Sequence, residues 1–179
     1  MAEFKESKIK EQQIVVFRLG EEEYAVPILQ IQEIVRLPEK ITFVPNTPDF
    51  IEGVMNLRGE ILPIVDLHKK FNIKKSQANL EKMRVVVIRV ENQIIGIVVD
   101  EVVEVLNTTE EQISDVPEMF TQIDYEYLSG IVKLKDRLII MLDLPKLFSD
   151  IEKEVLEWTT KKVKIQQEEL KKEYQKFIN

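Results

Sequence analysis

The feature of this 179-residue sequence that most constrains its fold is an internal repeat. The segment that begins at Val16 resembles the segment that begins at Val87, 71 residues later. Further along, residues 53–71 align without gaps on residues 130–148, which is an offset of 77. Because the offset grows by about six residues, the second half carries an insertion, which we place between Asn107 and Tyr127.

Short apolar runs in both halves indicate strands that are buried on at least one face. Strands this short and frequent are typical of barrels or a sandwich. We therefore predict a mainly β fold of two subdomains, at about 12–80 and 83–149, whose apolar faces pack together. The groove at their junction is a natural place for a partner. The runs are Ile14–Leu19, Tyr24–Ile28, Val54–Leu57, Ile61–Val65, Val85–Val90, Ile94–Val99 and Leu138–Leu142.

The C-terminal segment differs in composition from the rest. From Asp150 onward it is rich in Glu, Lys and Gln and contains neither Gly nor Pro. Ile151, Val155 and Trp158 recur at helical spacing, which predicts an amphipathic helix over 150–179, either continuous or broken near Thr159-Thr160. Its apolar stripe has two alternative roles, packing on this chain's own barrels or on a partner, and we favour the first.

Composition excludes several classes of function. Cysteine is absent, so the chain has no disulfide framework and no thiolate chemistry. A net charge of −7 disfavours sequence-independent binding to nucleic acid. The longest apolar run is too short for a membrane span, and the charged N-terminus lacks the features of a signal peptide. Four lysines, for which we favour a solvated loop over a binding patch, are Lys69, Lys70, Lys74 and Lys75.

Candidate catalytic residues are few. His68 is the single histidine, and we expect an exposed polar residue in a short helix rather than a catalytic base or a zinc ligand. The five glycines form no phosphate-binding loop. Asp66 and Asp143 occupy equivalent places in the repeat, so we favour helix caps over catalytic carboxylates. The sequence therefore predicts no enzyme activity, no metal and no cofactor.

One turn stands out in the first half. Asn56-Leu57-Arg58-Gly59 has the pattern of a hairpin turn, and Lys133-Leu134-Lys135-Asp136 lies at the equivalent place. The hairpin is thus structural, whereas its polar residues differ between the halves. Arg58 would present a fork of donors suited to a carboxylate, and the alternative is a solvated arginine.

These motifs resemble the CheW domain family of bacterial chemosensory proteins. The resemblance runs from about Gln12 to about Ile151, with its motifs in the right order. It implies two SH3-like, five-stranded β-barrels within a domain at 12–149, and a non-catalytic scaffold. The tail is longer than the family leads us to expect. The matching motifs are Phe17-x-Leu19, Tyr24–Ile28, Gln32–Ile34, Pro45–Pro48 and Gly53–Leu67.

The resemblance also implies partners. They are the cytoplasmic tip of a methyl-accepting chemoreceptor and the regulatory domain of a CheA-type histidine kinase. The protein would be cytoplasmic and recruited to membrane-bound receptor arrays. Its expected receptor-binding residues are Ile31, Glu33, Gly53 and Arg58. Its expected kinase-binding residues, for which ordinary core packing is the alternative, are Val35, Leu37, Ile41 and Phe43. A further array contact, with buried packing as the alternative, is formed by Met119 and Phe120.

Two rival functions stay open at this point. A coupling protein for a non-chemotactic chemosensory pathway would carry the same motifs. A small-barrel RNA-binding protein would need a basic surface that carries aromatic residues, whereas this chain is acidic and its one tryptophan lies in the tail.

Overall fold

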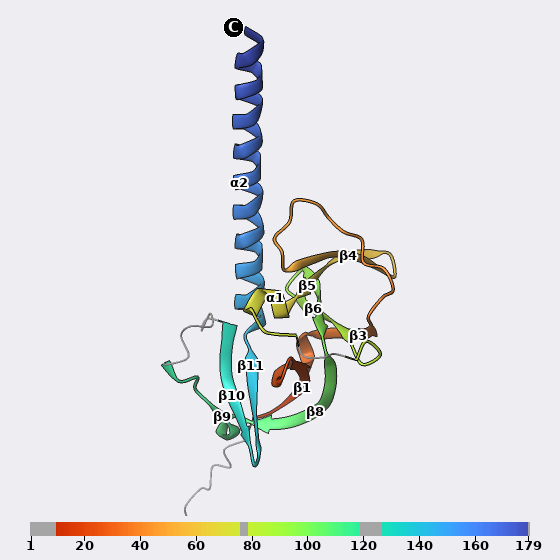
Figure 1. Cartoon of the computed structure of the whole chain (residues 1–179). Helices are drawn as coiled ribbons and strands as arrows, with labels where there is room; N and C mark the ends of the chain where they lie inside the picture. The colour runs from red at the N-terminus through yellow and green to blue at the C-terminus, as the bar shows by residue number, and fades with distance from the viewer. Residues whose placement is uncertain (1–9, 76–78, 119–126, 179) are drawn as a thin grey trace, which may run out of the picture.

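The computed structural model describes residues 10–75, 79–118 and 127–178. It shows two β-sheets and a long C-terminal helix (Figure 1), which confirms the predicted fold class. The strands are β1 (Glu11–Leu19), β2 (Glu22–Pro27), β3 (Ile31–Arg36), β4 (Ile51–Leu57), β5 (Glu60–Asp66), β6 (Arg84–Val90), β7 (Gln93–Val99), β8 (Glu101–Thr109), β9 (Ile113–Ser114), β10 (Leu128–Leu134) and β11 (Arg137–Leu142). The helices are α1 (Leu67–Phe71) and α2 (Leu144–Ile178), and the 3-10 turns are η1 (Ile28–Gln30) and η2 (Glu110–Gln112).

The two sheets have the same strand order but combine strands from both sequence halves. One sheet runs β3-β6-β7-β5-β4, and the other runs β8-β1-β2-β11-β10, extended by the two-residue strand β9. In the sequence repeat, β1 and β2 correspond to β6 and β7. Each sheet therefore takes its hairpin β1–β2 or β6–β7 from the opposite half. In both sheets this hairpin joins the remaining strands through a parallel pairing, β2 with β11 and β7 with β5.

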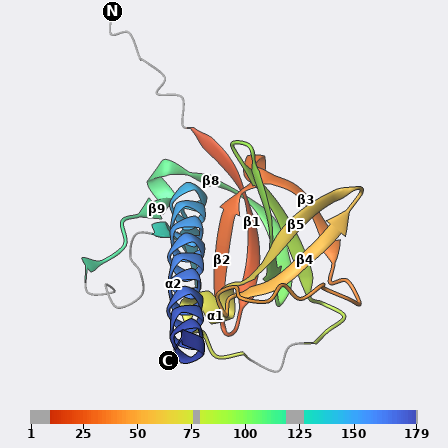
Figure 2. The same ribbon diagram turned by 90° about the horizontal axis from the view of Figure 1, so that it is seen from above.

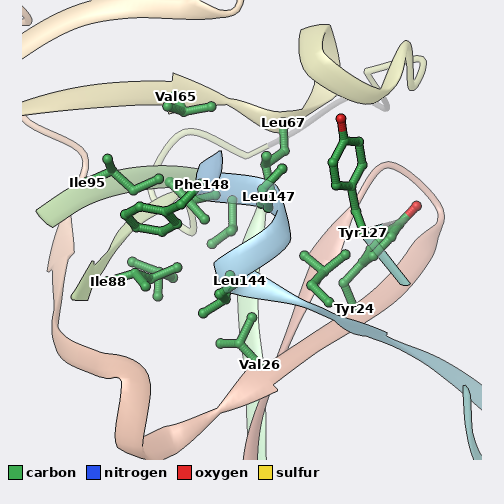
Figure 3. Packing of buried hydrophobic residues seen from close by; sticks show 14 of the residues in the cluster. Tyr24, Val26, Val65, Leu67, Ile88, Ile95, Tyr127, Leu144, Leu147 and Phe148 are labelled. Carbon is green, nitrogen blue, oxygen red and sulfur yellow. The ribbon is translucent and has the colours of Figure 1, made fainter. Parts of the chain in front are cut away.

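Buried side chains form three clusters, one between the sheets and one inside each barrel. Strand β6 shows why: Val86 and Ile88 face the central cluster, while Val85 and Val87 face the interior of their own barrel. A strand covered on both faces must be apolar at every position, which explains its unbroken run of apolar residues. Figure 3 shows the central cluster, where Leu144 and Phe148 of α2 pack among strands of both sheets. The expected packing of the two apolar faces against each other is confirmed.

The strands that the apolar runs did not reveal include β3 and β8. Each lies at an end of its sheet; β3 alternates between partly buried and exposed positions, and β8 is mostly partly buried with exposed residues at Val105 and Asn107. A strand covered on one face needs apolar residues only at every second position, so it leaves no continuous apolar run. This is why the sequence showed seven strand segments and the structure contains more.

Helix α2 is unbroken from Leu144 to Ile178, so it starts before the predicted position and does not break at Thr159-Thr160. Its first turns are anchored on the barrels, where Ile151 is buried. The expectation that the whole apolar stripe packs on this chain's own barrels is wrong for the distal half. There the helix extends past the barrels (Figures 1 and 2), and Phe177 is 91% exposed.

Candidate functional site

The β4–β5 hairpin places Arg58 at the tip of the five-stranded sheet. Arg58 and Gly59 both have positive φ, 52° and 88°, and the Asn56 Oδ1 atom accepts a hydrogen bond of 2.9 Å from the Gly59 N–H. Two consecutive positive φ values are typical of the tight turns that join antiparallel strands. A left-handed conformation costs a non-glycine residue roughly 1 kcal/mol. Arg58 therefore occupies a position that Gly or Asn would adopt with less strain.

Glu33 of β3 orients the Arg58 side chain. Its carboxylate lies 3.2 Å from Arg58 Nη2, and the Arg58 side chain is 80% exposed while that of Glu33 is 18% exposed. The exposure of Arg58 fits a solvated arginine, whereas its binding to a carboxylate of a partner stays a prediction. An exposed ion pair contributes at most about 1 kcal/mol, so its main effect is to direct the guanidinium. The pair presents a positioned, largely exposed cation at the surface.

Polar side chains continue from this pair across neighbouring strands. Arg89 of β6 donates a hydrogen bond of 2.9 Å to Gln32 of β3, and its guanidinium lies 3.4 Å from the Glu60 carboxylate of β5. Ile61, which pairs with Asn56 across the hairpin, is 70% exposed. A charged row with an exposed apolar side chain beside it has the character of a protein-binding surface.

The other two expected receptor residues lie in structural positions. A Cβ atom on Gly53 would lie 2.2 Å from the Thr42 carbonyl oxygen, and Gly53 has a φ of 147°. The backbones of Thr42 and Val54 exchange two hydrogen bonds of 2.9 Å there, which link the segment after β3 to β4. Ile31 packs against the central cluster. The structure therefore brings Glu33 and Arg58 together at the surface, whereas Gly53 permits a close backbone approach and Ile31 packs in the core.

The expected kinase residues divide in the same way. Val35, Leu37 and Ile41 are partly buried and pack against the interior cluster of the five-stranded sheet. Phe43 is 73% exposed. Val35, Leu37 and Ile41 thus fit the alternative of core packing, whereas Phe43 is accessible to a partner. Met119 and Phe120 lie outside the described residues.

An apolar groove of about 660 Å³ was not predicted; the strands that line it all belong to the five-stranded sheet, so it is not the groove expected at the junction of the two sheets. It opens where α2 leaves the barrels, between that helix and strands β4, β5 and β7. None of the four expected receptor residues lines it. No motif marked its lining, because the groove combines segments about 100 residues apart. The main apolar residues around it are Val44, Ile51, Val54, Val65, Ile95, Phe148, Ile151 and Val155.

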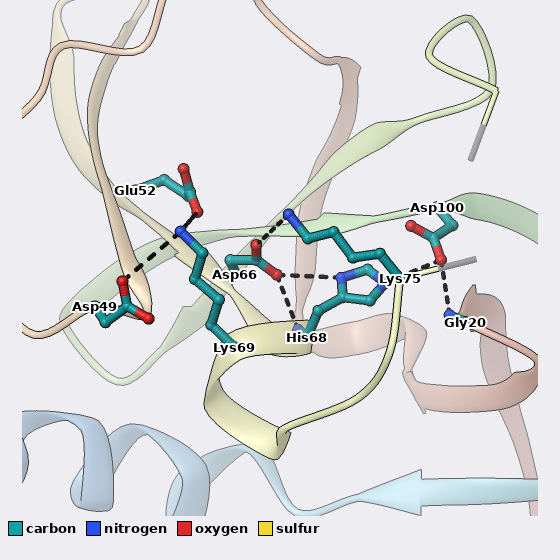
Figure 4. Close-up of polar contacts among 8 residues, drawn as sticks. All are labelled: Gly20, Asp49, Glu52, Asp66, His68, Lys69, Lys75 and Asp100. Carbon is teal, nitrogen blue, oxygen red and sulfur yellow. Dashed lines mark hydrogen bonds and ion pairs between the residues drawn. The ribbon is translucent and has the colours of Figure 1, made fainter. Parts of the chain in front are cut away.

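His68 is buried, which corrects the expectation of an exposed residue in a short helix. Its Nδ1 atom lies 3.1 Å from Asp66 Oδ1 and its Nε2 atom lies 3.0 Å from Asp100 Oδ2 (Figure 4). Asp100 also accepts a hydrogen bond of 2.7 Å from the Gly20 N–H, in the turn between β1 and β2. Carboxylates only accept, so both ring nitrogens donate and the imidazole is held as a cation. The cluster joins an end of one sheet to a turn of the other.

The charges in this cluster shift each other's pKa values. The hydrogen bond to Asp66 raises the pKa of His68; burial opposes the rise, and Asp100 adds to it. Burial alone would raise the pKa of Asp66, but hydrogen bonds from His68 and Lys75 outweigh it and hold that pKa well below its usual value. Asp66 also caps α1, since its Oδ1 atom accepts from the His68 backbone N–H at 2.9 Å. The predicted cap is confirmed, and the same carboxylate also contacts the His68 ring and the Lys75 ammonium.

The solvated loop that we favoured fits Lys74, which is exposed, but not Lys70. The Lys70 side chain is 3% exposed, and its ammonium lies 2.7 Å from the Asp150 carboxylate of α2. It also lies 5.0 Å from the ring centroid of Phe50. Lys69 pairs with Glu52, and Lys75 pairs with Asp66. Lys69 and Lys70 connect α1 to carboxylates on β4 and α2, whereas Lys75 in the following loop pairs with the aspartate that caps α1.

Within the described ranges, no group of three or more His, Cys, Asp or Glu side chains is arranged to hold a metal ion. The helices in these ranges also include none with the length and apolar character needed to cross a bilayer. The site therefore offers oriented charges and apolar surface.

Comparison with known proteins assigns the chain to a family. Residues 13–152 match the family described as "CheW-like domain". This chain belongs to the CheW family. Chemotaxis protein CheW of Klebsiella aerogenes is 44% identical over 141 residues, which cover 79% of this chain and 84% of that protein. Chemotaxis protein CheW of Helicobacter pylori is 41% identical over 131 residues, 73% of this chain and 77% of its relative.

A solved CheW structure has the same fold. The scaffolding protein TtCheW from Thermoanaerobacter tengcongensis superimposes with a TM-score of 0.70 at 37% sequence identity. The match covers 80% of this chain and 91% of that CheW chain. The CheW match ends at residue 152, so the distal part of α2 lies beyond it.

Proposed function

We propose that this chain is a non-catalytic scaffold that couples methyl-accepting chemoreceptors to a CheA-type histidine kinase in bacterial chemotaxis. The observation that carries the proposal is its membership of the CheW family over most of its length. Its curated relatives are chemotaxis proteins, and its structural neighbour is a scaffolding protein. As such a scaffold it acts in the cytoplasm and is recruited to membrane-bound receptor arrays.

The receptor surface that we propose centres on the Glu33–Arg58 pair. The exposed guanidinium can bind a carboxylate or carbonyl of a receptor helix, while Ile61 supplies apolar contact beside it. Gly53 and Ile31 support this surface from behind. Gly53 allows the close approach of Thr42 to β4, and Ile31 fixes β3 on the central cluster.

The kinase surface that we propose centres on Phe43. A large apolar side chain that is 73% exposed is the kind of residue that contributes strongly to protein interfaces. Val35, Leu37 and Ile41 then serve as the packed base beneath it. Signalling through such a scaffold requires that receptor states differ in their contacts with it, since equal binding to both states would transmit nothing.

The test is a reconstitution with receptor cytoplasmic fragments, the kinase and ATP. We expect this protein to bring the kinase into the receptor pellet and to change its autophosphorylation rate. Arg58→Glu should weaken receptor binding about tenfold or more, or about 1.4 kcal/mol, with the fold intact. Lys135→Glu makes the same charge change at the equivalent turn of the other sheet and is the matched control.

Three outcomes would contradict these assignments. If the chain binds neither partner, the coupling role is wrong. If Arg58→Glu folds normally and binds receptor as well as the Lys135→Glu control does, the receptor surface lies elsewhere. For the kinase, Phe43→Ala should reduce co-sedimentation without loss of stability, and unchanged kinase recruitment would exclude Phe43 from that interface.

A further inference from the structure

The distal half of α2, residues 161–178, carries apolar side chains into solvent. Leu170 is 64% exposed, Tyr174 is 68% exposed and Phe177 is 91% exposed. Most helical stability in proteins comes from the packing of an apolar face rather than from helix propensity. The exposed residues Leu170, Tyr174 and Phe177, here called the distal stripe, therefore suit a partner that covers them.

The spacing of apolar residues identifies the kind of partner. An apolar residue at every seventh position matches the heptad of a coiled coil, in which positions a and d face another helix. The d positions of this helix are Leu156, Val163, Leu170 and Phe177, seven residues apart in the sequence. The a positions between them are Thr160, Gln167 and Tyr174, so no charged residue falls at an a or d position over this stretch. The pattern fits a second helix with the same period.

The charges beside the stripe favour an identical helix in parallel orientation. Position e carries Lys164 and Lys171, whereas position g carries Gln166 and Glu173. Parallel pairing sets each e row against the g row of the other copy, so Lys171 faces Gln166 without like-charge contact. Antiparallel pairing would set the lysine-bearing rows against each other, which costs free energy.

A lipid surface fits this helix less well. Helices that lie on membranes are rich in lysine or arginine across the polar face, where they meet anionic headgroups. Here residues 161–178 carry six lysines, but Glu168, Glu169 and Glu173 interrupt that basic face. The seven-residue spacing of the apolar side chains is that of a helix pair, so a protein helix is the better occupant.

We propose that two copies of this chain associate through their distal stripes as a parallel two-stranded coiled coil. The paired segment spans about 27 Å at 1.5 Å per residue. Both pairs of barrels then lie at the same end of a short rod, and the Arg58 and Phe43 surfaces stay exposed. This inference concerns assembly and does not depend on which partners those surfaces bind.

The experiment is sedimentation equilibrium of the full chain between about 10 µM and about 1 mM, since a few heptads with polar a positions pair weakly. We expect the mass to rise from 21.0 kDa toward twice that value. Leu170→Glu should weaken association at least about tenfold while keeping helix propensity, because Leu and Glu are similar helix formers. Ile165→Glu is the matched control, since Ile165 is 51% exposed at outward position f of the same helix.

Orientation is tested by disulfide formation, which the absence of native cysteine makes specific. Tyr174→Cys should cross-link to its own copy under mild oxidation, because parallel pairing brings the two a positions together. A dimer that does not cross-link would overturn the parallel arrangement. A wild-type chain that stays monomeric at the highest concentration would overturn the proposal, as would equal effects of Leu170→Glu and Ile165→Glu. A monomer that co-sediments with phosphatidylglycerol vesicles would identify a lipid surface instead.

Discussion

The two sheets share a strand order, yet the aspartates that follow β5 and β11 have different surroundings. Asp66 caps the five-residue helix α1 and also lies against His68 and Lys75, nearly out of contact with solvent. Asp143 caps the 35-residue helix α2 through the Lys146 N–H at 3.1 Å, with a side chain that is 26% exposed. Both halves of the repeat therefore place a helix-capping aspartate directly after a strand. The side chains around that aspartate differ between the two halves.

The largest expected difference in stability between the two halves is at the equivalent glycines Gly53 and Gly130. A Cβ atom at Gly53 meets the Thr42 carbonyl oxygen at 2.2 Å, whereas one at Gly130 meets the Ile113 side chain at 2.6 Å and the Ser114 carbonyl oxygen only at 3.1 Å. Backbone cannot move aside as a side chain can, and Gly53 also has positive φ. We expect Gly53→Ala to lower the free energy of unfolding by about 4 kcal/mol or to prevent folding, and Gly130→Ala to cost about 1–2 kcal/mol. Urea unfolding monitored by circular dichroism measures both, and equal losses would refute the distinction.

The next largest difference in stability is expected between the two helix caps, Asp66 and Asp143. Asp143→Ala removes a helix cap and should cost about 1 kcal/mol. Asp66→Ala removes a cap and also leaves the buried His68 with one carboxylate partner, so we expect about 3 kcal/mol. Chemical unfolding of the two variants under identical conditions compares them. If Asp66→Ala costs no more than Asp143→Ala, the buried cluster contributes nothing beyond the cap.

The smallest effect is a pH dependence present in one half only, because the position equivalent to His68 is Pro145. The pKa of His68 is raised in the folded state, so its stabilising contribution is complete below the unfolded value of about 6.5 and is lost as pH rises through the folded pKa. The pKa of Asp66 is lowered, so its contribution is present above about pH 4 and is lost as pH falls. Lys75 and Asp100 are the other charges that face the pair.

Unfolding free energies measured from pH 4 to pH 9 test this. Wild-type stability should decline above about pH 6.5, while His68→Gln should lack that decline. A His68→Gln variant that declines in parallel with the wild type would assign the decline to other groups.

The sequence predicted features that depend on local pattern. The repeat and the strand-length apolar runs indicated a mainly β fold with two units, and the recurrence of aspartate after a strand predicted both caps. The turn at Arg58 was also predicted, because Asn-x-x-Gly between two strands is typical of a hairpin turn. The pairing of Arg58 with Glu33 was not predicted, because the carboxylate expected for Arg58 was that of a partner.

Features that depend on distant segments were not predictable in the same way. Lys70 looked like a loop lysine because its partner Asp150 lies 80 residues away. His68 looked exposed because nothing near it in the sequence shows that Asp100 lies beside it. The hairpin exchange was hidden for a different reason: the two halves resemble each other so closely that the strand pattern fits either pairing.

That exchange has a consequence for how the chain is made. During synthesis the first hairpin, β1–β2, emerges with no sheet to join, since its neighbours β8 and β11 come later in the chain. Strands β3, β4 and β5 also cannot complete their sheet until β6 and β7 have been synthesised, up to residue 99. The other sheet needs residues up to 142. Neither half can therefore form its barrel as it leaves the ribosome, and the nascent protein depends on long-range contacts that form slowly and late.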